Sequence, residues 1–237
     1  SMRDMNGAPE VKSQPEKLMR PAFVNGSLYF FQGYYESITD RPIVCDKSRQ
    51  WMWDYELLKE IINRTPFMFC MVRDLRDVFT SMEMNWRKNR HLNSGPDNAP
   101  KLLNMTLKER VATWSQDHPV GFSCKRLQNA IELNFTKDIY FIRYEDFTRN
   151  PDDCLQGLYE YLEIPYYQHD YKNIIKEVEE DHRWHGPFGN HDVQKELKPS
   201  VSKYQEVLGE DIGNEIISGF EWFYQTFYPE VLEQGES

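Results

Sequence analysis

Arg73 and Ser81 are the two residues whose types and spacing most clearly suggest chemistry. Arg73 follows directly after the apolar run from Phe67 to Val72, which predicts a buried strand, and Asp74 is suited to cap the helix that comes next. Arg73 is therefore expected at the carboxyl end of a strand, where open α/β sheets bind ligands. Ser81 lies about two helical turns further on, on nearly the same face as the helix start. A planar guanidinium and a hydroxyl that converge there would suit a phosphate group.

The same residues also have a simpler interpretation. An arginine beside an aspartate at a strand–helix turn often forms only a surface ion pair, and the spacing alone leaves that alternative open. Two further segments bear on the choice. Upstream, the short run Ile43 to Cys45 is followed by Asp-Lys-Ser-Arg at 46–49. Downstream, the run Ile139 to Arg143 is followed by Tyr-Glu-Asp at 144–146, and Asn150-Pro151 is suited to begin a helix.

Taken in this order, the three segments resemble the sulfotransferase superfamily, in its bacterial and phage type. These enzymes move a sulfuryl group from 3′-phosphoadenosine 5′-phosphosulfate (PAPS) to an acceptor. The resemblance runs from about Leu28 to Ile164. It implies that Arg73 and Ser81 bind the 3′-phosphate of PAPS, and that the Tyr144 hydroxyl contacts the adenine.

The resemblance also implies a catalytic role for Lys47. An ammonium beside the bridging oxygen would stabilise charge that develops only in the transition state, which is where binding accelerates a reaction. Structural interpretations stay open for two of these residues. Lys47 could simply keep its ammonium in water at a strand end, and Tyr144 could be a half-buried tyrosine whose hydroxyl is satisfied. Three residues are candidates for the general base, namely Glu36, Asp46 and His191.

The sequence departs from the superfamily at one segment. Sulfotransferases hold the 5′-phosphosulfate with a turn of the type Lys/Arg-Ser-Gly-Ser/Thr between a strand and a helix, whose backbone N–H groups face the anion. The sequence before Asp46 contains no such turn, because Asn6-Gly7-Ala8 follows no predicted strand and Gly26-Ser27 lies in a predicted helix.

Three hypotheses about function follow. The first is a PAPS-dependent sulfotransferase domain that acts on a hydroxyl of a small molecule or carbohydrate. The second is a catalytically silent relative that binds a nucleotide or a protein partner. The third is another phosphoryl- or nucleotide-handling enzyme on a P-loop-like sheet, and the missing glycine-rich turn counts against it.

The composition narrows the class of protein. A chain of 237 residues fits one domain, and 14% aromatic residues provide both a core and surfaces for stacking. A formal net charge of −10 argues against nucleic acid as the main partner. The four cysteines lack a C-x-x-C spacing and the histidines between His182 and His191 lack a ligand pattern, so no metal site is predicted. No long apolar run or signal peptide is visible, which predicts a cytoplasmic protein without a membrane span.

Strands that alternate with helices predict a three-layer α/β fold with a mainly parallel sheet. The strands are expected near 43–46, 67–72 and 139–143. Residues 1–20 are predicted to be flexible or irregular, and 21–237 to form a single domain. Helices are predicted over 23–36, 51–63, 76–89, 106–117 with a capping box, 119–133, 151–163 and 211–227. An irregular segment is predicted over 181–198.

Overall fold

The structure is a computed structural model that describes residues 16–90, 99–176 and 193–233. The chain divides into two compact units, an N-terminal unit Ser1–Phe67 and a C-terminal unit Met68–Ser237. The predicted single domain over 21–237 therefore stays a prediction. The elements, in chain order, are α3 (Glu16–Ile38), α4 (Tyr55–Ile62), β1 (Met68–Val72), α5 (Leu75–Asn89), α6 (Ala99–Leu102), α7 (Leu107–Gln116), α8 (Val120–Glu132), the 3-10 helix η1 (Thr136–Asp138), β2 (Ile139–Arg143), α9 (Tyr144–Arg149), α10 (Pro151–Tyr161), α11 (Tyr204–Val207), α12 (Glu210–Gly219), α13 (Glu221–Phe227) and α14 (Pro229–Glu233).

The N-terminal unit contains α3 and α4, and the strand predicted near 43–46 is wrong. Residues 43–46 have no regular secondary structure and all four side chains are exposed. A run of three apolar residues forms a strand only if a neighbouring strand takes up its backbone groups and a buried face receives its side chains. Within the described ranges no strand pairs with residues 43–46, and their side chains are exposed. Helix α3 begins at Glu16, so residues 16–20 are helical instead of irregular, and residues 1–15 lie outside the described part. Arg20 binds both carboxylate oxygens of Glu60, at 2.8 and 2.6 Å, which joins the two helices.

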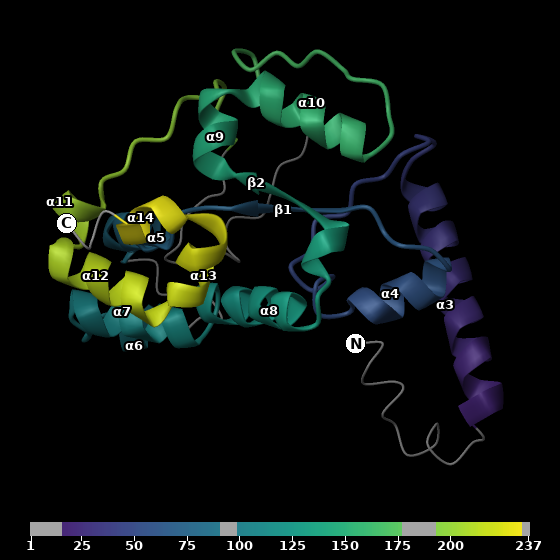
Figure 1. Cartoon of the computed structure of the whole chain (residues 1–237), viewed down its shortest axis with the longest axis horizontal. Coiled ribbons are helices and arrows are strands. Elements are labelled where there is room, and N and C mark those ends of the chain that lie inside the picture. The colour runs from purple at the N-terminus through teal and green to yellow at the C-terminus, as the bar shows by residue number, and fades with distance from the viewer. Residues whose placement is uncertain (1–15, 91–98, 177–192, 234–237) are drawn as a thin grey trace. The chain divides into compact units, whose positions relative to one another are not determined.

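The C-terminal unit is built around a parallel pair of strands. β1 pairs with β2 in a register that runs from Met68 beside Ile139 to Val72 beside Arg143, so the strands predicted over 67–72 and 139–143 are confirmed and share a sheet. In Figure 1, α9 and α10 lie on one side of this pair, and α8, α12 and α13 lie on the other. The fold is rich in helices and its parallel strands fit the α/β class. The described residues contain two strands, so the wider three-layer sheet stays a prediction.

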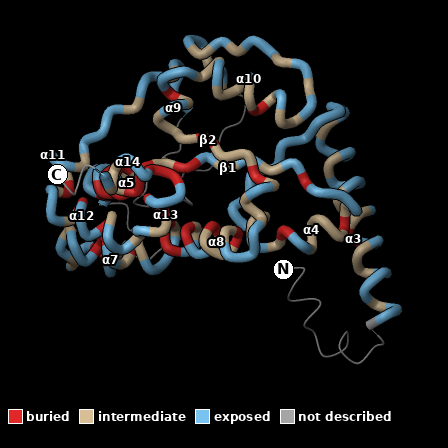
Figure 2. The backbone as a smooth tube through the Cα atoms, viewed as in Figure 1, coloured by how far each residue is buried: buried red, intermediate tan, exposed pale blue. Residues whose placement is uncertain are grey.

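The core of the C-terminal unit lies where α5 meets the last helices of the chain. Figure 2 shows buried residues concentrated on α5, α8 and α13. Phe79 on α5 and Tyr224 on α13 are completely buried, and Ile216 on α12 is 3% exposed. The single helix predicted over 211–227 is wrong, because the chain breaks at Phe220 into α12 and α13. Ser218 and Gly219 are poor helix formers and precede this break, which lets α13 turn its aromatic face inward.

A buried ion pair fixes α5 against α7. Glu83 on α5 is fully buried and accepts hydrogen bonds from Arg110 Nε at 2.9 Å and Nη2 at 2.6 Å. The Arg110 guanidinium also lies 3.8 Å from the ring centroid of Trp86. Helix α7 begins with the predicted capping box of Thr106 and Glu109. Helix α5 also carries Ser81, which is predicted to bind a phosphate, so these contacts fix the position of that helix.

Candidate functional site

The ends of the two strands bring Arg73 and Tyr144 together. Val72 lies beside Arg143 in the sheet register, so the next residue of each strand leaves the sheet at the same edge. The Arg73 guanidinium lies 4.7 Å from the centroid of the Tyr144 ring, within the range of a cation–π contact. Arg73 Nε is buried and has no hydrogen-bond partner among the residues that the structure describes. Two of the predicted site residues therefore touch each other, and one guanidinium donor between them is unused.

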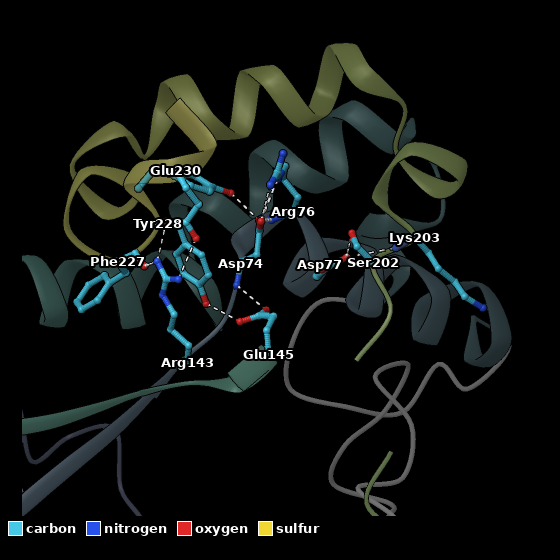
Figure 3. Close-up of polar contacts among 11 residues, drawn as sticks. Asp74, Arg76, Asp77, Arg143, Glu145, Ser202, Lys203, Phe227, Tyr228 and Glu230 are labelled. Carbon is cyan, nitrogen blue, oxygen red and sulfur yellow. Dashed lines mark hydrogen bonds and ion pairs between the residues drawn. The ribbon is translucent and has the colours of Figure 1, made fainter. Parts of the chain in front are cut away.

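The two neighbouring arginines are each paired with a carboxylate, as Figure 3 shows. Arg76 binds the Asp74 carboxylate through Nε at 3.0 Å and Nη2 at 2.5 Å. Arg143 binds Glu230 through Nη1 at 2.8 Å and Nη2 at 2.9 Å, and also donates to the backbone oxygen of Phe227. Burial lowers the pKa of Arg76, but the bonds to Asp74 outweigh this and raise its pKa overall. Within the ranges that the structure describes, no carboxylate pairs with Arg73.

Asp74 and Glu145 fix the start of α5 next to the start of α9. Asp74 is the predicted N-cap, and its Oδ1 accepts from the Arg76 backbone N–H at 2.9 Å and from the Tyr224 hydroxyl at 2.9 Å. Glu145 accepts from the Asp74 backbone N–H at 3.2 Å and from the Tyr228 hydroxyl at 2.8 Å. Burial and the neighbouring carboxylates raise the pKa of both tyrosines, so the phenols stay protonated donors. The sequence allowed an ion pair between Asp74 and a neighbouring arginine. In the structure that arginine is Arg76 and not Arg73.

Ser81 is half-buried on α5, one helical turn after Asp77. Asp77 is itself buried and accepts a hydrogen bond from the Ser202 hydroxyl at 2.7 Å and from the Lys203 backbone N–H at 3.4 Å. The described residues show a cation–π contact between Arg73 and Tyr144, and no hydrogen bond from Ser81 to either of them is seen in this part of the chain. Helix α5 nevertheless begins immediately after Arg73 and Asp74, so Ser81 lies on the helix that directly follows Arg73.

Lys47 lies in the N-terminal unit, on the exposed irregular segment after Cys45. Its expected place at a strand end is wrong because residues 43–46 do not form a strand, and its catalytic role stays a prediction. Among the candidates for the general base, Asp46 accepts a hydrogen bond from the Tyr35 hydroxyl. Burial, followed by this bond, raises the pKa of Tyr35 to about 12. Glu36 is exposed, and His191 lies outside the described residues.

A groove of about 490 Å³ opens along β2 and the segment from Thr226 to Pro229, and it reaches Val72 and Arg143, the last residues of the two strands. Its cation is Arg143, which Glu230 already neutralises. It does not include Arg73, Ser81 or Tyr144. We therefore assign the candidate site to the strand ends, where a cationic donor is unused.

Comparison with known families decides the class of protein. The family model of the sulfotransferase domain matches residues 52–207, well over half of the chain. The chain belongs to the sulfotransferase domain family. No curated protein and no solved structure matches it. The matched region contains Arg73, Ser81 and Tyr144, whereas Lys47 precedes it.

The irregular segment 198–203 is the part of this sulfotransferase domain that sequence reasoning missed. It lies against α5 and α9 through Asp77 and Thr148, although its sequence has neither helical nor strand periodicity. The irregular segment predicted over 181–198 is only partly described, from residue 193 onward, and that part has no helix or strand. The described residues contain no group of three or more acidic, histidine or cysteine side chains that could hold a metal ion, and the stretch 182–191 lies outside them. None of the helices in the described ranges is long and apolar enough to cross a membrane.

Proposed function

We propose that the chain is a PAPS-dependent sulfotransferase domain, which transfers a sulfuryl group to a hydroxyl of a small molecule or carbohydrate. The observation that carries this proposal is the unpartnered guanidinium donor of Arg73, buried against Tyr144 at the end of β1. A buried donor that is left unbonded costs free energy, so a ligand that supplies an acceptor is favoured there. A phosphate group fits, because a guanidinium can bind two of its oxygens at once.

Each site residue has a defined role in this proposal. Arg73 and Ser81 bind the 3′-phosphate, and Tyr144 orients the adenine. The contact between Arg73 and Tyr144 holds the guanidinium in position before a ligand arrives, which reduces the entropy lost on binding. PAPS, as the second substrate, supplies the sulfuryl group. The Lys47 ammonium stabilises negative charge on the bridging oxygen, and the proposal gives no role to a metal ion.

The proposal is tested by comparing adenosine 3′,5′-bisphosphate with ATP as stabilising ligands. A ligand at about 100 times its dissociation constant should stabilise the fold by about 2.7 kcal/mol, and the 3′-phosphate should make the bisphosphate the stronger of the two. Sulfuryl transfer from PAPS is then assayed against a panel of phenols, alcohols and sugars. Equal stabilisation by both nucleotides, or by neither, would contradict the assignment of the site.

A catalytically silent relative is the second candidate, because the sequence before Asp46 lacks the glycine-rich turn that holds a 5′-phosphosulfate. The two candidates differ in one outcome. A silent relative binds adenosine 3′,5′-bisphosphate with a preference for the 3′-phosphate but transfers no sulfuryl group to any acceptor.

A further inference from the structure

The groove along β2 contains none of the residues of the proposed nucleotide site, and the proposed function gives it no role. Its volume of about 490 Å³ lies within the range of sites for small ligands. Residues 140–143 of β2 line it, together with Val72 of β1. Asp146 on α9, Cys154 on α10 and Phe227 at the end of α13 also line it. Because several elements contribute to the lining, the fold itself shapes this groove.

Much of the groove's surface is aromatic. Tyr140 and Phe141 come from β2, and the Phe141 ring lies against the Phe227 ring with their centroids 5.0 Å apart. Phe227 is 8% exposed, whereas Tyr140 and Phe141 are only half-buried, so part of each of these two rings is open. The faces of aromatic rings carry a negative potential that attracts cations. A ligand with an apolar body and a positive charge would therefore suit this surface.

The charged side chains at the groove also favour a cation. Arg143 lines it, but its guanidinium is bound by Glu230 at 2.8 and 2.9 Å, as Figure 3 shows. Asp146 is exposed, and its carboxylate forms no hydrogen bond or ion pair within the part of the chain that the structure describes. Two carboxylates and one guanidinium leave one negative charge without a counterion. The formal net charge of −10 on the whole chain would further attract cations to it.

We propose that this groove binds a small organic cation, namely an ammonium group attached to a ring or a short apolar chain. The ammonium group pairs with the Asp146 carboxylate, and the apolar part packs against the open rings of β2. The inference goes beyond the proposed function and does not rest on it, because neither Arg73 nor Tyr144 lines the groove. A nucleotide does not suit the groove, because its phosphates would meet Asp146 and would find Arg143 already paired.

Three ligands of similar size test the preference for a positive charge. Benzylamine, benzyl alcohol and benzoate are titrated into the whole chain and followed by nuclear magnetic resonance. Benzylamine should bind about fivefold more tightly than benzyl alcohol, and benzoate should bind most weakly. Asp146→Asn keeps the size of the side chain and should remove the advantage of benzylamine. Asp153→Asn is the matched control, because Asp153 is an exposed carboxylate outside the lining of the groove, and it should change the affinity by less than about twofold.

Cys154 gives a readout that needs no variant, because its thiol lines the groove. A trimethylammonium-ethyl and a sulfonatoethyl methanethiosulfonate each form a mixed disulfide with a thiolate and release methanesulfinate. Mass spectrometry compares their rates at Cys154 with those at Cys45, which is exposed in the N-terminal unit. The cationic reagent should have the larger relative rate at Cys154, and benzylamine should slow its reaction there but not at Cys45.

Three results would overturn the inference about the groove. The first is that benzyl alcohol binds as tightly as benzylamine, or that none of the three ligands binds. The second is that Asp146→Asn keeps the preference for benzylamine. The third is that the two reagents show the same relative rate at Cys154. None of these measurements uses a nucleotide, so their outcome is independent of the proposed function.

Discussion

Breaking the buried ion pair between Glu83 and Arg110 should cost a large part of the stability of the C-terminal unit. Glu83 is completely buried, and its two oxygens accept hydrogen bonds from Arg110 at 2.6 and 2.9 Å and from Arg87 Nε at 2.7 Å. Glu83→Gln preserves the volume of the side chain but removes the charge, and it places an amide N–H₂ where only acceptors fit. Breaking a buried pair costs about 3–5 kcal/mol, because the other charge stays buried without compensation. A typical domain has a free energy of unfolding of about 5–15 kcal/mol, so this loss should be obvious.

Urea unfolding followed by circular dichroism measures the free energy of unfolding of the variants. Arg87→Met is the matched control, since it removes a guanidinium from the same carboxylate but from a side chain that is 51% exposed. The Arg87 end of this pair is open to solvent and Glu83 keeps Arg110 as a partner in the variant, so the control should lose about 1 kcal/mol or less. Arg110→Met should resemble Glu83→Gln. If Glu83→Gln costs no more than Arg87→Met, the buried pair does not hold α5 against α7 as the geometry implies.

Two further predictions concern catalysis and acid stability. Lys47→Ala should lower the turnover number about 10²–10³-fold. The affinity for adenosine 3′,5′-bisphosphate should stay within a few fold, because this product carries no sulfuryl group. Near-normal turnover would leave Lys47 without a catalytic role. The hydrogen bonds from Arg143 hold the pKa of Glu230 below its ordinary value of 4.5. The ionised carboxylate therefore stabilises the fold fully above about pH 4.5. This contribution is lost as the pH falls through the lowered pKa. Glu230→Gln should therefore unfold more easily than the unaltered chain at pH 7, and urea titrations should show the difference disappearing in strong acid; a difference independent of pH would refute this assignment.

The parts of the fold that local sequence determines were predictable. Asp74 caps α5, and Thr106 with Glu109 caps α7, because each capping bond joins residues only two or three positions apart. The strands over 67–72 and 139–143 were predictable as well, since their apolar runs are bounded by turns. The contact between Arg73 and Tyr144 follows from these strands, because the carboxyl ends of parallel neighbours meet at one edge.

Features that depend on distant partners were not predictable. The run Ile43 to Cys45 has the composition of a strand, but composition cannot show whether a neighbouring strand is available. The pairing of Arg143 with Glu230, and of Asp77 with Ser202, joins residues 87 and 125 positions apart in the chain. The choice of Arg76 over Arg73 as the partner of Asp74 depends on side-chain direction at the helix start, which the spacing does not reveal. The unused donor of Arg73 became visible only in three dimensions.

The central claim is that Arg73 binds the 3′-phosphate of a nucleotide, and the most direct measurement compares two ligands on the unaltered chain and on two variants. Calorimetry gives the affinities of adenosine 3′,5′-bisphosphate and adenosine 5′-phosphate for the unaltered chain, for Arg73→Ala and for Arg90→Ala, an exposed arginine at the far end of α5. A charged hydrogen bond is worth about 1.5–3 kcal/mol, so Arg73→Ala should weaken the bisphosphate by about 10- to 150-fold and the 5′-phosphate far less, while Arg90→Ala changes neither. Equal weakening of both ligands by Arg73→Ala would contradict the claim.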